Sequence, residues 1–243
     1  MANVTGERWK GNLVYLDRGA HLKRWVDAIG PDVVKVIKDF TDGPGIDTAF
    51  DDEWTVTRVE AGAGESTMTR IDGIGGLARI TTDAAENDGI NAQLIGEAFE
   101  LTADQFLYFG AFGVTLSDAT QSDFFLGLAI TDTDILGGIT DRIGFEKLDG
   151  VTDLKAMLEK DSVETLSGSL ATLVDATPFT VEFFWDGANN RVEFFVNGAS
   201  AYVPALTNLP NDEALRITWQ FLAGAAAAKT MDIDRLTVIQ IGR

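Results

Sequence analysis

Pairs of carboxylates are the residues of this chain whose spacing could support acid–base chemistry. Hydrolysis of a glycosidic bond needs two carboxyl groups about 5–10 Å apart, one as proton donor and the other as base or nucleophile. Residues two apart share one face of a β-strand, and residues on paired strands can meet across a hairpin. Three pairs come near this arrangement: Asp232 with Asp234, Asp132 with Asp134, and Glu182 with Glu193. Solvated carboxylates on strands are far commoner than catalytic ones, so we predict no catalytic residue and no enzyme.

Other catalytic residue types are scarce in this chain. It contains no cysteine, which excludes thiolate catalysis, disulfide bonds and cysteine-ligated zinc. His21 is the only histidine, and it lies in an amino-terminal segment unlike the rest of the chain. A Ser–His–Asp mechanism is therefore not favoured, and we expect His21 to cap a helix or to face solvent.

Oxygen ligands that would suit calcium occur in two acidic turns. They are the side chains of Asp83, Glu86, Asn87 and Asp88 in the first turn, and of Asp132 and Asp134 in the second. No twelve-residue loop has EF-hand spacing, and acidic turns are expected in a chain this negative. The sequence therefore predicts no cofactor and assigns no metal ligand, with calcium left as an alternative.

Net charge and hydropathy together indicate which partners and locations we do not expect. The chain has 19 Lys and Arg against 38 Asp and Glu, a net charge of −19, which would repel a phosphate backbone. No apolar run is long enough for a transmembrane helix, and the first residues lack the pattern of a secretory signal. We therefore expect no nucleic-acid partner, no membrane and no signal peptide.

The charge is also unevenly distributed along the chain. Residues 1–40 hold seven Lys and Arg against five Asp and Glu, whereas residues 41–243 hold twelve against thirty-three. A small solvated element beside an acidic domain would explain this asymmetry. The alternative is an arm that docks on an acidic neighbour.

The amino-terminal segment also differs in its pattern. Residues 21–29 place apolar side chains at helical spacing and predict one short helix, which Gly30 and Pro31 would end. Residues 32–40 could form a strand or a second helical turn. The glycine- and proline-containing stretch 41–52 indicates a linker. We therefore predict a basic amino-terminal arm and linker over residues 1–47, and a β-domain over residues 48–243.

Turns and alternating apolar residues predict strands through the rest of the chain. A helix or a hairpin is possible at 154–166. Strands are expected at residues 54–59, 77–82, 90–95, 106–116, 123–131, 214–222 and 231–241.

Residues 179–198 predict a hairpin of two aromatic-rich strands around the turn at residues 187–190. One face of each strand is apolar and must be buried. Phe184 and Phe195 lie on the opposite face, beside acidic residues. That second face could be covered by loops or by the amino-terminal arm, or it could form an oligomer or partner surface.

The hairpin and the closing Asp232-Ile233-Asp234 run resemble those of the concanavalin A-like (LamG-like) jelly-roll superfamily. The resemblance covers roughly residues 48–243 and implies a two-sheet sandwich. Hydrolases of that superfamily build their site with an E-x-D-x-E run on a strand. Here Leu236 follows Asp232 and Asp234, and no Glu flanks the pair, so the resemblance does not extend to a hydrolytic site.

More narrowly, the amino-acid sequences of three stretches resemble those of phage virion proteins of this fold. They are GGLARITTDAAENDGINAQLIGEAFEL, DATQSDFFLGLAITDTDIL and DRIGFEKLDG. This resemblance implies a capsid-associated protein made in the bacterial cytoplasm and located in the virion.

The sequence as a whole predicts an all-β protein, a two-sheet antiparallel jelly-roll sandwich with a short amino-terminal arm containing one helix. We predict a non-enzymatic virion structural protein that decorates or cements a phage capsid through its arm. Its partners would be the major capsid protein or other virion subunits, and it would form a homo-oligomer. The alternative is a carbohydrate-binding (lectin-like) module, and a glycoside hydrolase is third. The residues predicted to contact a partner are Arg8, Trp9, Lys10, Lys23, Arg24, Trp25, Phe184 and Phe195.

Overall fold

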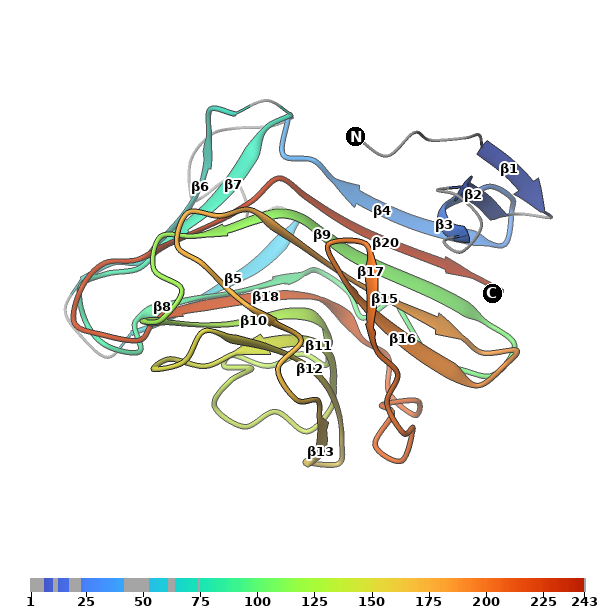
Figure 1. The fold of residues 1–243 in the computed structure, drawn as a ribbon. Coiled ribbons are helices and arrows are strands. Elements are labelled where there is room, and N and C mark those ends of the chain that lie inside the picture. The colour runs from blue at the N-terminus through green and yellow to red at the C-terminus, as the bar shows by residue number, and fades with distance from the viewer. Residues whose placement is uncertain are drawn as a thin grey trace.

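A computed structural model shows an all-β sandwich of two antiparallel sheets, with a small third sheet at the amino terminus (Figure 1). It describes residues 7–10, 13–17, 23–41, 53–60, 64–73 and 75–242. The predicted all-β fold class and two-sheet antiparallel architecture are confirmed. Among the described residues, no helix is long and apolar enough to cross a membrane.

One layer is an eight-stranded sheet in the order β13-β12-β11-β10-β18-β8-β5, with β14 paired to β12. The strands are β5 (Trp54–Val59), β8 (Gly89–Leu94), β10 (Ser122–Ala129), β11 (Arg142–Lys147), β12 (Asp153–Lys160), β13 (Val163–Leu166), β14 (Ala171–Thr172) and β18 (Arg216–Ala223). The ambiguous segment 154–166 is thus a hairpin of β12 and β13 and not a helix.

The other layer is a nine-stranded sheet in the order β17-β16-β15-β9-β19-β7-β6, in which β20 pairs with β9 and with β4. The strands are β4 (Val33–Lys38), β6 (Thr67–Ile71), β7 (Leu77–Thr81), β9 (Phe106–Leu116), β15 (Phe179–Asp186), β16 (Arg191–Val196), β17 (Ala199–Tyr202), β19 (Thr230–Ile233) and β20 (Arg235–Ile241). The single predicted strand at 231–241 is therefore two strands, divided at Asp234.

The predicted hairpin is formed by β15 and β16, and its apolar face lies in the core between the two sheets. Phe183 is fully buried, with its ring 5.1 Å from that of Phe109 and 5.7 Å from that of Phe194. Phe194 in turn meets Phe145 of the eight-stranded sheet edge to face at 5.3 Å. The alternation read from the sequence therefore identifies the buried face correctly, because side chains of a strand alternate between its two sides.

The helix predicted at residues 21–29 is wrong. Residues 23–28 form strand β3 (Lys23–Ala28), which pairs with β2 (Leu13–Asp17), and β2 pairs with β1 (Glu7–Lys10). An isolated helix of nine residues is marginal in water, whereas pairing with β2 satisfies the backbone of β3. Figure 1 shows this three-stranded sheet at one end of the sandwich, near the carboxyl terminus.

Part of the predicted arm belongs to the sandwich itself. Strand β4 pairs with β20 along its whole length, from Val33 opposite Ile241 to Lys38 opposite Leu236. The undecided segment 32–40 is therefore a strand. The domain boundary predicted near residue 47 lies outside the described residues.

Candidate functional site

The face of the eight-stranded sheet that points away from the core is the polar face of the sandwich. On β18, Ile217 and Trp219 pack into the core, while Arg216, Thr218 and Gln220 point to the other side. Across the sheet, Gln220 lies opposite Asn91 on β8 and opposite Phe125 on β10. We call this side the outer face of the eight-stranded sheet.

Three charged residues form a buried cluster on the outer face. Arg142 Nε donates a hydrogen bond to Glu159 Oε2 at 2.6 Å, and Arg142 Nη1 lies 3.3 Å from Glu146 Oε2. Each of the three residues is at most 8 % exposed. Burial raises the pKa of Glu146, and the positive charge of Arg142 opposes that rise. We call these residues the Arg142 cluster.

The Arg142 cluster contains two carboxylates, and both pair with the same guanidinium. A hydrolase needs one carboxyl that can deliver a proton and another that can reach the sugar or a water. Glu146 and Glu159 both face Arg142 and are closed off from solvent. The arrangement therefore suits a structural ion network better than acid–base catalysis.

The loop 130–141, which connects β10 to β11, covers the outer face. Side-chain amides of the sheet bind its backbone. Asn91 Nδ2 donates to the Asp132 carbonyl at 2.9 Å, Gln93 Nε2 donates to that of Ile130 at 2.8 Å, and Gln220 Oε1 accepts from the Leu136 N–H at 2.8 Å. Each bond fixes a different part of the loop.

Apolar contacts complete this cover. Ile135 and Ile139 of the loop are buried against Phe125, Ala129 and Met157 of the sheet. The loop also receives a hydrogen bond from the cluster, since Arg142 Nη1 donates to the Ile135 carbonyl at 3.2 Å. The chain's own loop therefore covers this part of the outer face.

The carboxylates singled out from the sequence have structural partners. Asp232 accepts two hydrogen bonds from Arg79, at 2.6 and 2.8 Å. Asp132 and Asp134 accept backbone N–H groups within loop 130–141, and Asp134 also accepts from Gln220 Nε2 at 2.7 Å. The structure therefore places these side chains in turns and ion pairs, where they stabilise the fold.

The hairpin register places Glu182 opposite Phe195 and Glu193 opposite Phe184, so the two glutamates share the face opposite Trp185 as diagonal neighbours and do not lie directly opposite each other. Glu182 is fully buried and accepts a hydrogen bond from the Tyr108 hydroxyl at 2.5 Å. Glu193 accepts from the Ser200 hydroxyl and lies 3.0 Å from Arg191.

The two phenylalanines of the hairpin's second face are partly buried. The Phe184 ring stacks on that of Phe106 at 6.2 Å, next to a cluster that contains Ala28 and Val33 of the amino-terminal segment. The six other residues predicted to contact a partner lie on β1 and β3, and their side chains are outside the described part of the structure: Arg8, Trp9, Lys10, Lys23, Arg24 and Trp25.

No metal site forms among the described residues, where no group of three or more His, Cys, Asp or Glu side chains gathers around one point. Of the acidic turn at 83–88, Asp88 is fully buried and Glu86 is exposed. The described residues therefore provide no set of carboxylate ligands for the calcium alternative.

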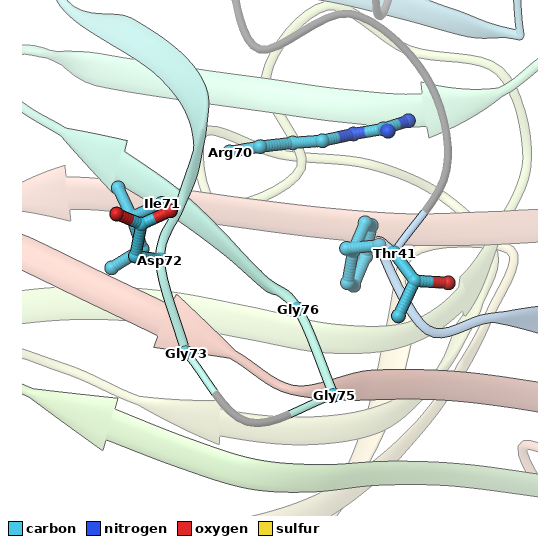
Figure 2. A pocket seen from close by; sticks show the side chains of 8 residues that line it. Thr41, Arg70, Ile71, Asp72, Gly73, Gly75 and Gly76 are labelled. Atoms are coloured by element: carbon cyan, nitrogen blue, oxygen red, sulfur yellow. The ribbon is translucent and has the colours of Figure 1, made fainter.

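A pocket of about 440 Å³ lies beside the turn between β6 and β7 (Figure 2). Its lining includes several glycines together with Arg70 and Asp72, whose side chains extend in different directions in Figure 2. Gly76 has a φ of +78°, and a Cβ there would come within 2.6 Å of the Phe40 backbone, so the turn requires glycine. The pocket offers one carboxylate and therefore no acid–base pair.

The Arg142 cluster is not among the sites predicted from the sequence. Residues 142–147 alternate as a strand should, with Arg142, Gly144 and Glu146 on one side. That alternation was the available signal. The partner Glu159 could not be found this way, because the pairing of Arg142 with Glu159 depends on the register of β11 and β12.

Comparison with solved structures shows a concanavalin A-like fold, similar to that of several proteins named as glucanases. An endo-1,3-β-glucanase from Streptomyces sioyaensis superposes with a TM-score of 0.65 at 12% identity, over 90% of this chain and 100% of the other. A glycoside hydrolase family 16 endo-glucanase from Bacteroides ovatus gives 0.58 at 12% identity, over 84% and 99%. A pseudo β-1,3-glucanase of Mycobacterium tuberculosis gives 0.58 at 12% identity, over 86% and 98%.

No protein-family model and no curated protein matches the sequence. At these identities the likeness to solved structures establishes the concanavalin A-like jelly-roll fold and nothing finer. It supports the broader of the two resemblances read from the sequence and gives no support to the phage one.

Proposed function

We propose that this protein binds glycans without hydrolysing them, as a lectin-like module on a glucanase-type sandwich. Two of the similar structures are named as glucanases and a third as a pseudo-glucanase, and each superposes over most of this chain. That similarity supports a carbohydrate ligand. It says nothing of which sugar.

The Arg142 cluster is the observation that carries the non-hydrolytic part of the proposal. Glu146 and Glu159 are the paired carboxylates of the outer face, and both are buried against Arg142 beneath loop 130–141. Neither can act as proton donor or nucleophile toward a sugar without breaking that network. Binding without turnover is consistent with this arrangement.

The test is to offer the protein soluble β-1,3-glucan and mixed-linkage β-glucan, with and without calcium. We expect retarded migration of the protein in gels containing one of the glucans and no release of reducing ends. Release of reducing ends that is lost in Glu146→Gln or Glu159→Gln would support a glycoside hydrolase instead. Unchanged migration in both glucans, and no signal on a wider glycan array, would refute the proposal.

A structural subunit of a phage particle is the second candidate. The amino-terminal sheet attached at one end of an acidic sandwich supports it, because a tethered element of different charge suits docking. Its partners would be the major capsid protein or other virion subunits, and its location the virion. An antibody against the protein should then label purified particles from the cells that make it. Unlabelled particles would remove this candidate.

A further inference from the structure

The amino-terminal sheet is fixed at one end of the sandwich. Ala28, the last residue of β3, is 1 % exposed and packs with Tyr108 and Ile241. Ile241 pairs with Phe106, at the start of β9. Only residues 29–32 separate β3 from β4, so the amino-terminal sheet cannot travel far from this point.

The opposite end of the sandwich lies beyond Leu116, the last residue of β9. The eleven residues of β9 span about 35 Å in extended conformation. Backbone hydrogen bonds gather several turns at this far end: Gly150 N–H donates to the Thr120 carbonyl at 2.9 Å, and Gly224 N–H to that of Gln121 at 3.1 Å. The amino-terminal sheet therefore cannot reach these turns in its own chain.

These turns carry many carboxylates. The ammonium groups of the two lysines among them already contact oxygen atoms of this chain. Hydrogen bonds place the carboxylates here: Asp118 accepts the Gln121 N–H at 2.8 Å, Asp175 accepts the Ala119 N–H at 2.7 Å, and the buried Asp123 accepts the Asp149 N–H at 2.7 Å. Glu86 lies beside Asn87, whose N–H donates to the Ala223 carbonyl at 2.7 Å. The Lys147 ammonium donates to the carbonyls of Thr120 and Ser122, and the Lys229 ammonium lies 2.7 Å from Asp118. We call this surface the acidic end.

Exposed apolar side chains lie within the acidic end. Leu148 is 46 % exposed, Val151 44 % and Val174 59 %. The Leu173 N–H donates to the Thr152 carbonyl at 2.8 Å and extends the β12–β14 ladder, which places Val151 opposite Val174. Apolar side chains rimmed by carboxylates are typical of a surface that binds a basic segment with apolar residues.

We propose that the acidic end binds the amino-terminal segment of a second copy of this chain. Residues 1–28 hold five Lys and Arg against three Asp and Glu, together with two tryptophans, so their charge and apolar content complement the acidic end. The two surfaces lie at opposite ends of one molecule, so the contact is head to tail. Such heterologous contacts form rings where the rotation closes and filaments where it does not.

This inference goes beyond glycan binding and does not depend on it. Self-association is measured without any sugar, so failure of one proposal leaves the other intact. Salt screens the attraction between the basic segment and the acidic end, because the Debye length falls from about 10 Å at 0.1 M to about 3 Å at 1 M. We therefore expect the assemblies to weaken as the salt concentration rises.

Light scattering on the full-length protein at low and high salt provides the first test. We expect species larger than a monomer at low salt that dissociate at high salt. Glu86→Lys with Asp149→Lys should shift the protein to monomer at low salt. The control Glu100→Lys with Glu213→Lys makes the same charge change at exposed residues elsewhere and should leave assembly intact. A wild-type monomer at low salt, or equal dissociation of both variants, would overturn the proposal.

A charge-swap experiment separates a lost contact from a lost fold. Lys10→Glu with Arg24→Glu reverses the amino-terminal segment and should also give monomers. Mixing this variant with Glu86→Lys/Asp149→Lys should restore assembly, because the negative segment of one variant meets the positive end of the other, while the two unchanged surfaces form the wild-type contact. A mixture that stays monomeric contradicts the proposal.

The apolar contribution has its own control. Val151→Thr with Val174→Thr should weaken assembly at least tenfold in the apparent dissociation constant. Val163→Thr with Val203→Thr, at exposed valines away from the acidic end, should change it less than twofold. Equal effects of the two pairs would refute a role for the acidic-end valines.

Discussion

Replacing Arg142 by Met tests whether the outer face of the eight-stranded sheet is held by charge. Methionine keeps much of the aliphatic stem but removes the guanidinium that pairs with Glu146 and Glu159. Breaking a buried ion pair by removing one partner typically destabilises a protein by about 3–5 kcal/mol. Folded domains have only about 5–15 kcal/mol of stability in total, so the loss should be plain.

The expected loss depends on pH in a definite direction. Burial raises the pKa of Glu146, and removing Arg142 takes away the charge that opposes this rise. An acid whose pKa is raised by folding favours the folded state below its unfolded pKa, and this stabilisation is lost as pH rises through the folded pKa. The deficit of Arg142→Met relative to wild type should therefore be largest near neutral pH and shrink toward about pH 4.5.

Urea unfolding followed by tryptophan fluorescence at several pH values measures this deficit. Arg191→Met is the matched control, because Arg191 is 52 % exposed while paired with Glu193, and such pairs contribute at most about 1 kcal/mol. A neutral-pH loss below about 1 kcal/mol for Arg142→Met would refute the charge argument. A large loss of stability that does not vary with pH would mean that lost packing causes it, since the guanidinium also lies 5.5 Å from the Phe125 ring centre.

Three further predictions use the same unfolding measurement. Glu146→Gln should gain stability relative to wild type as pH rises through the raised pKa of Glu146; a constant difference would contradict this. Burial lowers the pKa of Lys147 to about 8, so wild-type stability should rise by up to about 3 kcal/mol between pH 8 and 10.5, and Lys147→Met should lack that rise. An equal rise in the stability of wild type and Lys147→Met would contradict this prediction. Phe183→Ala should lose about 3–5 kcal/mol, against less than about 0.5 for Val163→Ala, which is 56 % exposed.

The strands were predictable where one face of a strand is buried. The alternation in β15 and β16 identifies both strands and their buried face, because a strand with one buried face repeats every two residues. Strand β11 was missed although its residues alternate, and the helix expected at residues 21–29 is a strand. In a short segment, apolar residues at helical spacing also fit an extended chain, and pairing with β2 then decides the structure.

The candidate site was far less predictable than the strands. Arg142 and Glu146 lie four residues apart, but Glu159 joins them only through the register of β11 and β12. The register of β15 and β16 likewise decides that Glu182 and Glu193 are diagonal neighbours and not a directly opposed pair. Side-chain partners between strands follow from register, and a shift of one residue moves each side chain to the other face.

The sequence by itself determined the all-β class, the buried face of the hairpin and the uneven charge, because alternation and composition are local properties. Only the tertiary structure decided where those charges meet. It covers part of the outer face with loop 130–141, buries Glu146 and Glu159 against Arg142, and places the amino-terminal sheet and the acidic end at opposite ends of β9. These outcomes depend on contacts between residues distant in sequence, whose energies are set by burial and register and leave no local pattern in the chain.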